Sequence, residues 1–142
     1  MRQLLIFLFI HLSLQVWSQD PVNWTFSFNK EDQTAEFTAT LEEGWHLYSL
    51  TTKPDAGPIA TSFQFNENDA IKLKGKTKEP EAIEEYDENF ESQLKYFEHQ
   101  VVFTQKVKTS EETSLSGSVT YMVCNATMCL PPVDEQFEII LN

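Results

Sequence analysis

The chain has 142 residues, and its 22 acidic side chains outnumber ten basic ones, which gives a formal net charge of −12 at pH 7 with histidine neutral. A domain this acidic repels nucleic acid and anionic lipid, so we exclude nucleic-acid binding. The length suits one domain, large enough to build a hydrophobic core without cross-links.

The first 18 residues have the pattern of a secretory signal peptide. Arg2 supplies a short positive region, residues 4–14 are mostly apolar, and Val16 and Ser18 occupy the −3 and −1 positions of a cleavage site. The apolar run is shorter than the ~20 residues that span a bilayer, which favours a signal peptide over a membrane anchor. We therefore expect cleavage after Ser18, a domain over residues 19–142 with no transmembrane segment, and a periplasmic or secreted location.

The rest of the chain has the pattern of short β-strands. Apolar side chains recur at every second position, as in Trp24, Phe26 and Phe28, and turn-forming clusters separate the runs. Strands at this spacing predict an all-β, single-domain β-sandwich, and no segment has the pattern of an amphipathic helix. The expected strands cover residues 22–28, 35–41, 44–50, 59–65, 70–73, 94–107 (as one bulged strand or two), 115–123 and 137–141.

Residues 78–93 interrupt this pattern. The segment is acidic, contains Pro80, and includes the run Tyr86-Asp87-Glu88-Asn89-Phe90. We expect a surface loop, and a loop this long in a compact domain is often functional. One place for its aromatic side chains is over a reactive site.

Cys124 and Cys129 are the only cysteines, and four residues separate them. A disulfide that closes so small a loop stabilises a fold by only about 2 kcal/mol, against roughly 4–5 kcal/mol for a loop of a hundred residues. Flanking strands would let the sulfurs meet across a hairpin-like loop. Pro131 and Pro132 cannot donate ladder hydrogen bonds, which favours exposure of Cys129. Thiol–disulfide exchange needs a thiolate, an accessible sulfur and a resolving thiol, and this pair could supply all three.

Two other interpretations of the pair remain open. One is a structural disulfide, which an exported chain also permits. The other is a Cys2His2 metal site completed by His46 and His99, although neither histidine is near the cysteines in sequence. We expect no metal and no other cofactor. A thioredoxin fold is disfavoured because its Cys-x-x-Cys motif begins a helix beside a βαβ pattern.

The segment Tyr121-Met122-Val123-Cys124 through Met128-Cys129-Leu130-Pro131-Pro132 resembles the active-site segment of the periplasmic N-terminal domain of the thiol:disulfide interchange protein DsbD. Residues 44–48 and 86–97 are similar to two further segments of that family and occur in the same order. The resemblance covers essentially the whole chain after residue 18. It implies an immunoglobulin-like β-sandwich.

The resemblance also implies a function, that of a thiol:disulfide oxidoreductase in a protein-disulfide reductase relay. The pair would take electrons from a thioredoxin-like reductase domain or membrane donor and pass them to oxidised periplasmic proteins such as disulfide isomerases. We expect another protein to supply that donor. Cys129 would attack the partner disulfide and Cys124 would resolve the mixed disulfide.

The remaining site residues follow from the same resemblance. Phe90, or alternatively Tyr86, would be the aromatic side chain of a cap loop that shields the sulfurs. Tyr48 and the acidic pair Asp87 and Glu88 would lie near them, and nearby carboxylates disfavour a thiolate. The chain departs from the family in having four residues rather than five between its cysteines. The rival function is a non-catalytic, exported binding or assembly module with a structural disulfide.

Overall fold

The computed structural model describes residues 20–87 and 90–142, which form eleven β-strands and no helix. The expected signal peptide, residues 1–18, and Glu88 lie outside the described residues. No described segment forms a helix with the length and apolarity of a membrane span. The strands are β1 (Val22–Asn29), β2 (Thr34–Leu41), β3 (His46–Tyr48), β4 (Ser62–Phe65), β5 (Ile71–Lys78), β6 (Ile83–Asp87), β7 (Ser92–Glu98), β8 (Gln100–Thr109), β9 (Thr113–Tyr121), β10 (Val123–Cys124) and β11 (Val133–Leu141).

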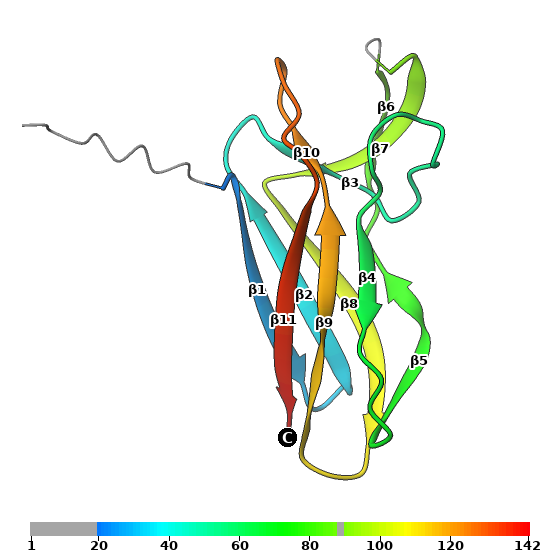
Figure 1. Cartoon of the computed structure of the whole chain (residues 1–142), viewed down its shortest axis with the longest axis vertical. Coiled ribbons are helices and arrows are strands. Elements are labelled where there is room, and N and C mark those ends of the chain that lie inside the picture. The colour runs from blue at the N-terminus through cyan, green and yellow to red at the C-terminus, as the bar shows by residue number, and fades with distance from the viewer. Residues whose placement is uncertain (1–19, 88–89) are drawn as a thin grey trace, which may run out of the picture.

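The strands build three antiparallel sheets, with the orders β1-β2-β8-β5, β11-β9-β4 and β10-β3-β7-β6. The first two pack against each other as a β-sandwich along the length of the molecule (Figure 1). The third lies at one end of it, opposite the C-terminus (Figure 1). The prediction of an all-β sandwich is therefore confirmed.

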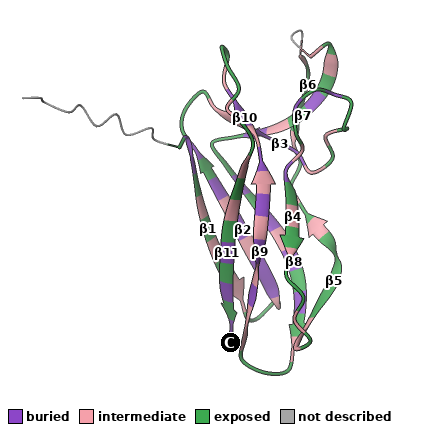
Figure 2. Ribbon diagram, viewed as in Figure 1, coloured by how far each residue is buried: buried purple, intermediate pink, exposed green. Residues whose placement is uncertain are grey.

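Aromatic side chains from both sheets fill the sandwich. Phe37 of β2 is fully buried, and its ring centroid lies 4.8 Å from that of Phe63 on β4 and 4.9 Å from that of Phe137 on β11. Buried and less buried positions alternate along β2, β8 and β9 (Figure 2). This two-residue period is the one found in the sequence, and it turns one face of each sheet into the core.

The structure differs from the predicted strands at several boundaries. The long run 94–107, expected as one bulged strand or two, is two strands, β7 and β8, separated at His99, whose φ is +60°. The predicted strand 44–50 is ordered as a strand only over its middle three residues, and the run 115–123 divides into β9 and β10. Each break falls where the chain leaves one sheet and enters another.

The prediction of a surface loop over residues 78–93 is wrong in part, because the segment contains a strand. This strand is β6, which pairs with β7 along its whole length. β6 is the edge of its sheet, and four of its five residues are exposed. An edge strand with both faces in solvent has no apolar alternation, so its sequence resembles that of a polar loop.

Candidate redox site

The two faces of the sheet β10-β3-β7-β6 have different roles. Val123, Leu47 and Phe97 pair in one row across three strands, and all three are buried in the main core. Successive side chains of a strand point to opposite faces. Cys124 and His46, next to Val123 and Leu47, therefore lie on the other face, and this face carries the candidate site.

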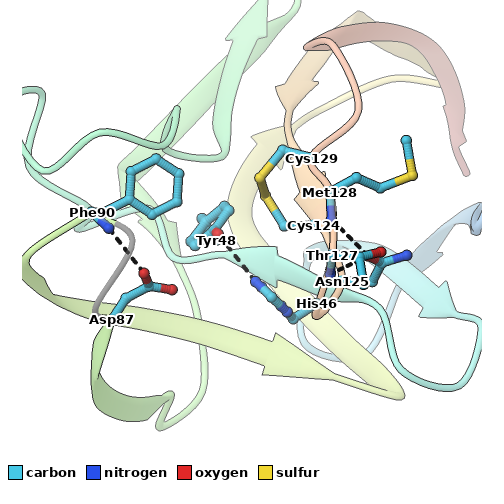
Figure 3. Close-up of a disulfide and its surroundings, with 9 residues drawn as sticks. All are labelled: His46, Tyr48, Asp87, Phe90, Cys124, Asn125, Thr127, Met128 and Cys129. Carbon is cyan, nitrogen blue, oxygen red and sulfur yellow. Dashed lines mark hydrogen bonds between the residues drawn. A yellow bond between two sulfur atoms is a disulfide. The ribbon is translucent and has the colours of Figure 1, made fainter.

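The two cysteines form a disulfide across the base of a hairpin (Figure 3). Their Cα atoms are 4.0 Å apart and pair as an antiparallel bridge. The Asn125 amide donates to the Met128 carbonyl at 2.9 Å on one side of the bridge, and the Leu130 amide donates to the Val123 carbonyl at 2.9 Å on the other. The predicted hairpin-like loop is thus confirmed.

Asn125 stabilises the tip of this hairpin. Its Oδ1 accepts hydrogen bonds from the Thr127 amide at 2.9 Å, the Thr127 hydroxyl at 3.0 Å and the Met128 amide at 2.9 Å (Figure 3). An asparagine that bonds the backbone two and three residues ahead mimics a backbone turn. The four residues between the cysteines therefore form an ordered turn.

The two cysteines differ in exposure. Cys124 is 2% exposed, whereas Cys129 and the adjacent Met128 are exposed. Pro131 and Pro132 are also exposed and belong to no strand, and β11 begins only at Val133. A thiolate that approaches from solvent therefore meets Cys129 first.

The disulfide forms one wall of an open pocket of about 270 Å³. Four of its lining residues come from outside the hairpin, and Figure 3 shows them on the side of the pocket away from the hairpin. They are His46, Tyr48, Asp87 and Phe90. The pocket thus brings together five of the predicted site residues from three separate segments of the chain.

Two other side chains considered from the sequence lie elsewhere. Tyr86 is 61% exposed and lines a smaller neighbouring pocket rather than the one beside the disulfide. His99 is exposed at the turn between β7 and β8. Across residues 20–87 and 90–142, no three histidine, cysteine or acidic side chains are grouped closely enough to hold a metal ion. Glu88 lies outside the described residues.

Phe90 is held against the pocket by two contacts. Its amide donates to Asp87 Oδ1 at 3.0 Å (Figure 3). Its ring packs against Gly57, where an added Cβ would overlap Phe90 Cδ1. Gly57 also has a φ of +106°, which L side chains rarely adopt, so two constraints call for glycine here. The loop after β3 therefore forms the seat of the Phe90 ring.

Burial and negative charge set the electrostatics of the pocket. The Tyr48 hydroxyl and His46 Nε2 are 3.0 Å apart and share a hydrogen bond. Burial, helped by the charge of Asp87, raises the pKa of Tyr48 to about 12. Among the described residues that line the pocket, Asp87 is negative and none is a lysine or arginine. Such surroundings disfavour a cysteine thiolate.

A β-sandwich that carries one close, unequally exposed disulfide on a sheet face has the architecture of a thiol:disulfide interchange domain. The family model described as the N-terminal domain of the thiol:disulfide interchange protein DsbD matches residues 14–141. The chain belongs to this family, which performs thiol:disulfide interchange with partners. No curated protein matches the chain.

Three solved structures are similar to this fold. The reduced DsbD N-terminal domain of Neisseria meningitidis shares 18% identity with a TM-score of 0.64, over 86% of each chain. The same organism's complex between the DsbD and PilB N-terminal domains shares 17% identity with a TM-score of 0.61, over 82% of this chain and 80% of that one. The N-terminal periplasmic domain of ScsB from Proteus mirabilis shares 16% identity with a TM-score of 0.55, over 82% of this chain and 44% of that one. The immunoglobulin-like fold implied by the resemblance is confirmed.

The raised pKa of Tyr48 predicts a loss of stability in alkali. Folded protein holds this phenolic proton more tightly than unfolded protein, so the stabilisation is complete below the ordinary tyrosine pKa of about 10. It is lost as the pH rises through about 12. In urea unfolding across this range, Tyr48→Phe should flatten the decline of the free energy of unfolding.

The matched control for this test is Tyr86→Phe, because the Tyr86 side chain is 61% exposed. It should leave the pH dependence as in the wild type. An equally steep decline in Tyr48→Phe would contradict the assignment.

Proposed function

We propose that this chain is a periplasmic electron relay, in which the Cys124–Cys129 pair carries two electrons between partner proteins. In this proposal a signal peptide over residues 1–18 exports the domain of residues 19–142. The observation that carries the proposal is the pairing of an exposed Cys129 with a buried Cys124 beside an open pocket. A disulfide with one accessible sulfur suits attack by a protein thiol, whereas a purely structural bond gains nothing from exposure.

In the first half-reaction of the relay, the reduced cysteine pair passes two electrons to a partner disulfide. The Cys129 thiolate attacks a partner disulfide, forms a mixed disulfide and displaces one partner thiolate. The Cys124 thiolate then attacks Cys129 Sγ, forms the intramolecular disulfide and displaces the second partner thiolate. The partner gains two electrons and, after both thiolates are protonated, two protons.

Recharging is the reverse reaction with a different protein. A donor thiolate attacks the exposed Cys129 Sγ, and the buried Cys124 sulfur leaves. The second donor thiolate then attacks the donor sulfur of the mixed disulfide, which forms the donor's disulfide and releases Cys129 as a thiolate. We propose a thioredoxin-like reductase domain or a membrane protein as this donor, supplied by another chain, and oxidised periplasmic proteins such as disulfide isomerases as acceptors. The Neisseria meningitidis complex between the DsbD and PilB N-terminal domains supports a protein partner for a domain of this fold.

Phe90 and the acidic surroundings would limit the reactivity of the two cysteines while no partner protein is bound. Phe90 lines the disulfide pocket, whereas Tyr86 does not, which favours Phe90 as the cap residue. Asp87 and Tyr48 line the same pocket, and the proposal gives them and Glu88 the role of site environment. A carboxylate beside the sulfurs disfavours the thiolate, which limits reaction with small oxidants.

The order of attack predicts which single cysteine variant traps a partner. Reduced Cys124→Ala, mixed with an oxidised disulfide isomerase, should accumulate a mixed disulfide through Cys129 because the resolving thiol is gone. Reduced Cys129→Ala should trap little, since Cys124 is 2% exposed. Non-reducing electrophoresis with mass spectrometry measures both adducts. More adduct from Cys129→Ala would reverse the assigned roles, and none from either variant would favour the non-catalytic module.

The cap predicts a change in reactivity toward small thiols. Phe90→Ala should accelerate reduction of the disulfide by dithiothreitol severalfold, because loss of the ring removes one wall of the pocket beside the sulfurs. Gly57→Ala should act in the same direction, since its methyl group would displace the ring. Tyr86→Ala is the control and should react like the wild type. Acceleration in Tyr86→Ala alone would transfer the cap to Tyr86.

A further inference from the structure

Three strands place a sulfur, an imidazole and a carboxylate in one cross-strand row. Cys124 of β10 is the ladder partner of His46 on β3, and His46 is the ladder partner of Glu98 on β7. Side chains directly opposite in an antiparallel pair have Cβ atoms roughly 4.5–5.5 Å apart. In the pairing order of the three strands, His46 therefore stands between Cys124 and Glu98, and the relay chemistry described so far makes no use of its imidazole.

The row matters because Cys124 is a poor leaving group. Reduction of the disulfide through Cys129 requires Cys124 to depart with an electron pair. Cys124 is 2% exposed, and burial disfavours a charged sulfur. Asp87 lines the same pocket and Glu98 ends the row, so negative charge adds to the cost. A proton supplied as the S–S bond breaks would remove this cost.

The position of the His46 ring suits that task. Its Nε2 shares the 3.0 Å hydrogen bond with the Tyr48 hydroxyl, and its ring meets the Tyr96 ring with centroids 4.9 Å apart. One ring nitrogen is thereby engaged and the orientation is fixed, which leaves Nδ1 for a proton transfer. Figure 3 shows the ring beneath Cys124 on the pocket side of the sheet.

We propose that His46 donates a proton to Cys124 when the disulfide is reduced and accepts it back when the disulfide forms, with Glu98 stabilising the imidazolium. This role rests on the relay function proposed above. In reduction, a partner thiolate bonds to Cys129 Sγ, the S–S bond breaks, its electron pair goes to Cys124 Sγ, and the imidazolium protonates that sulfur. In oxidation, His46 takes the thiol proton as Cys124 Sγ attacks Cys129 Sγ and the partner leaves as a thiolate. The proton then passes to solvent or to that thiolate.

The charges around the ring support both halves of this cycle. Burial lowers the pKa of His46, while the negative charges of Glu98 and Asp87 oppose that shift. The neutral imidazole is then the resting form at neutral pH. In oxidation it accepts the Cys124 proton directly, and in reduction it first takes up the proton that the partner thiol releases on becoming a thiolate and then passes that proton to Cys124. In both directions the two carboxylates stabilise the imidazolium that forms. The titratable groups facing the ring are Tyr48 on its own strand, Cys124 and Cys129 from the hairpin, Tyr96 and Glu98 from β7, and Glu85 and Asp87 from β6.

Reaction with a small neutral disulfide reagent resolves the reactions of the two cysteines as two kinetic phases. Reduced protein mixed with equimolar dithiodipyridine releases one thiopyridone when Cys129 attacks and a second when Cys124 resolves. The first phase depends on reagent concentration and the second does not. His46→Gln should leave the first phase unchanged and slow the second roughly tenfold or more near neutral pH, within the usual range for general acid–base catalysis. The titration of the second phase in the histidine range should also disappear.

Two further variants complete the test. His99→Asn is the matched control, because His99 is exposed and its φ of +60° suits asparagine, so both phases should stay as in the wild type. Glu98→Gln should move the histidine titration of the second phase to lower pH, because it removes a negative charge beside the ring. If His46→Gln does not fold, the result with Glu98→Gln decides.

Several outcomes would overturn the role of His46. These are an unchanged second phase, equal slowing of both phases at every pH, or an unmoved titration in Glu98→Gln. A carboxyl titration that persists in His46→Gln with an unchanged rate would assign the proton to Asp87. A wild-type protein that releases no second thiopyridone would contradict the relay itself, and this role with it.

Discussion

The pairing register of β3 with β7 and β10 is the constraint on which the site depends. Leu47 is fully buried between Phe97 and Val123 in the main core. A register slip of one residue would send this apolar row to the surface, so the hydrophobic core holds the register. The residues next to this row along each strand must then point to the opposite face of the sheet. Cys124 and His46 therefore lie together on the outer face. The main core therefore positions the chemistry, although no residue of that main cluster takes part in it.

This arrangement separates redox change from fold stability. Cys124 belongs to a small buried cluster with Tyr48, Ala56 and Leu94, distinct from the main cluster that fills the sandwich. The loop it closes is short, so the bond adds only about 2 kcal/mol by constraining the unfolded chain. Because the main core does not include the bond, we expect reduction to leave that core intact. This arrangement suits the proposed redox cycling of the pair.

Much of this architecture could be predicted from the sequence, because it depends on local periodicity. The alternation around Phe37 and Phe103 predicts the sandwich, and the spacing of Cys124 and Cys129 predicts the hairpin that joins them. β6 could not be found in this way, since an edge strand with both faces in solvent has no apolar period. Its position explains how Asp87, at the end of β6, reaches the pocket.

The parts of the site that could not be predicted from the sequence depend on how strands distant in the chain pair with each other. His46 and Cys124 are 78 positions apart, and from the sequence His46 is only a possible metal ligand. Gly57 has no sequence motif, and its contact with Phe90 follows from the path of the loop after β3. Such pairs become visible only once the order of the strands is known, because spacing in the chain contains no information about which strands are neighbours.

The equilibrium between the Cys124–Cys129 disulfide and thioredoxin, with glutathione buffers as a second reference, tests the central claim most directly. Thioredoxin has a reduction potential of about −270 mV, whereas structural disulfides in secreted proteins typically lie below about −300 mV. A relay predicts that reduced thioredoxin converts a substantial fraction of the pair to dithiol and that oxidised protein reforms when the ratio is reversed. A pair that stays oxidised against reduced thioredoxin and in every glutathione buffer would contradict the account and leave a structural disulfide on a binding module.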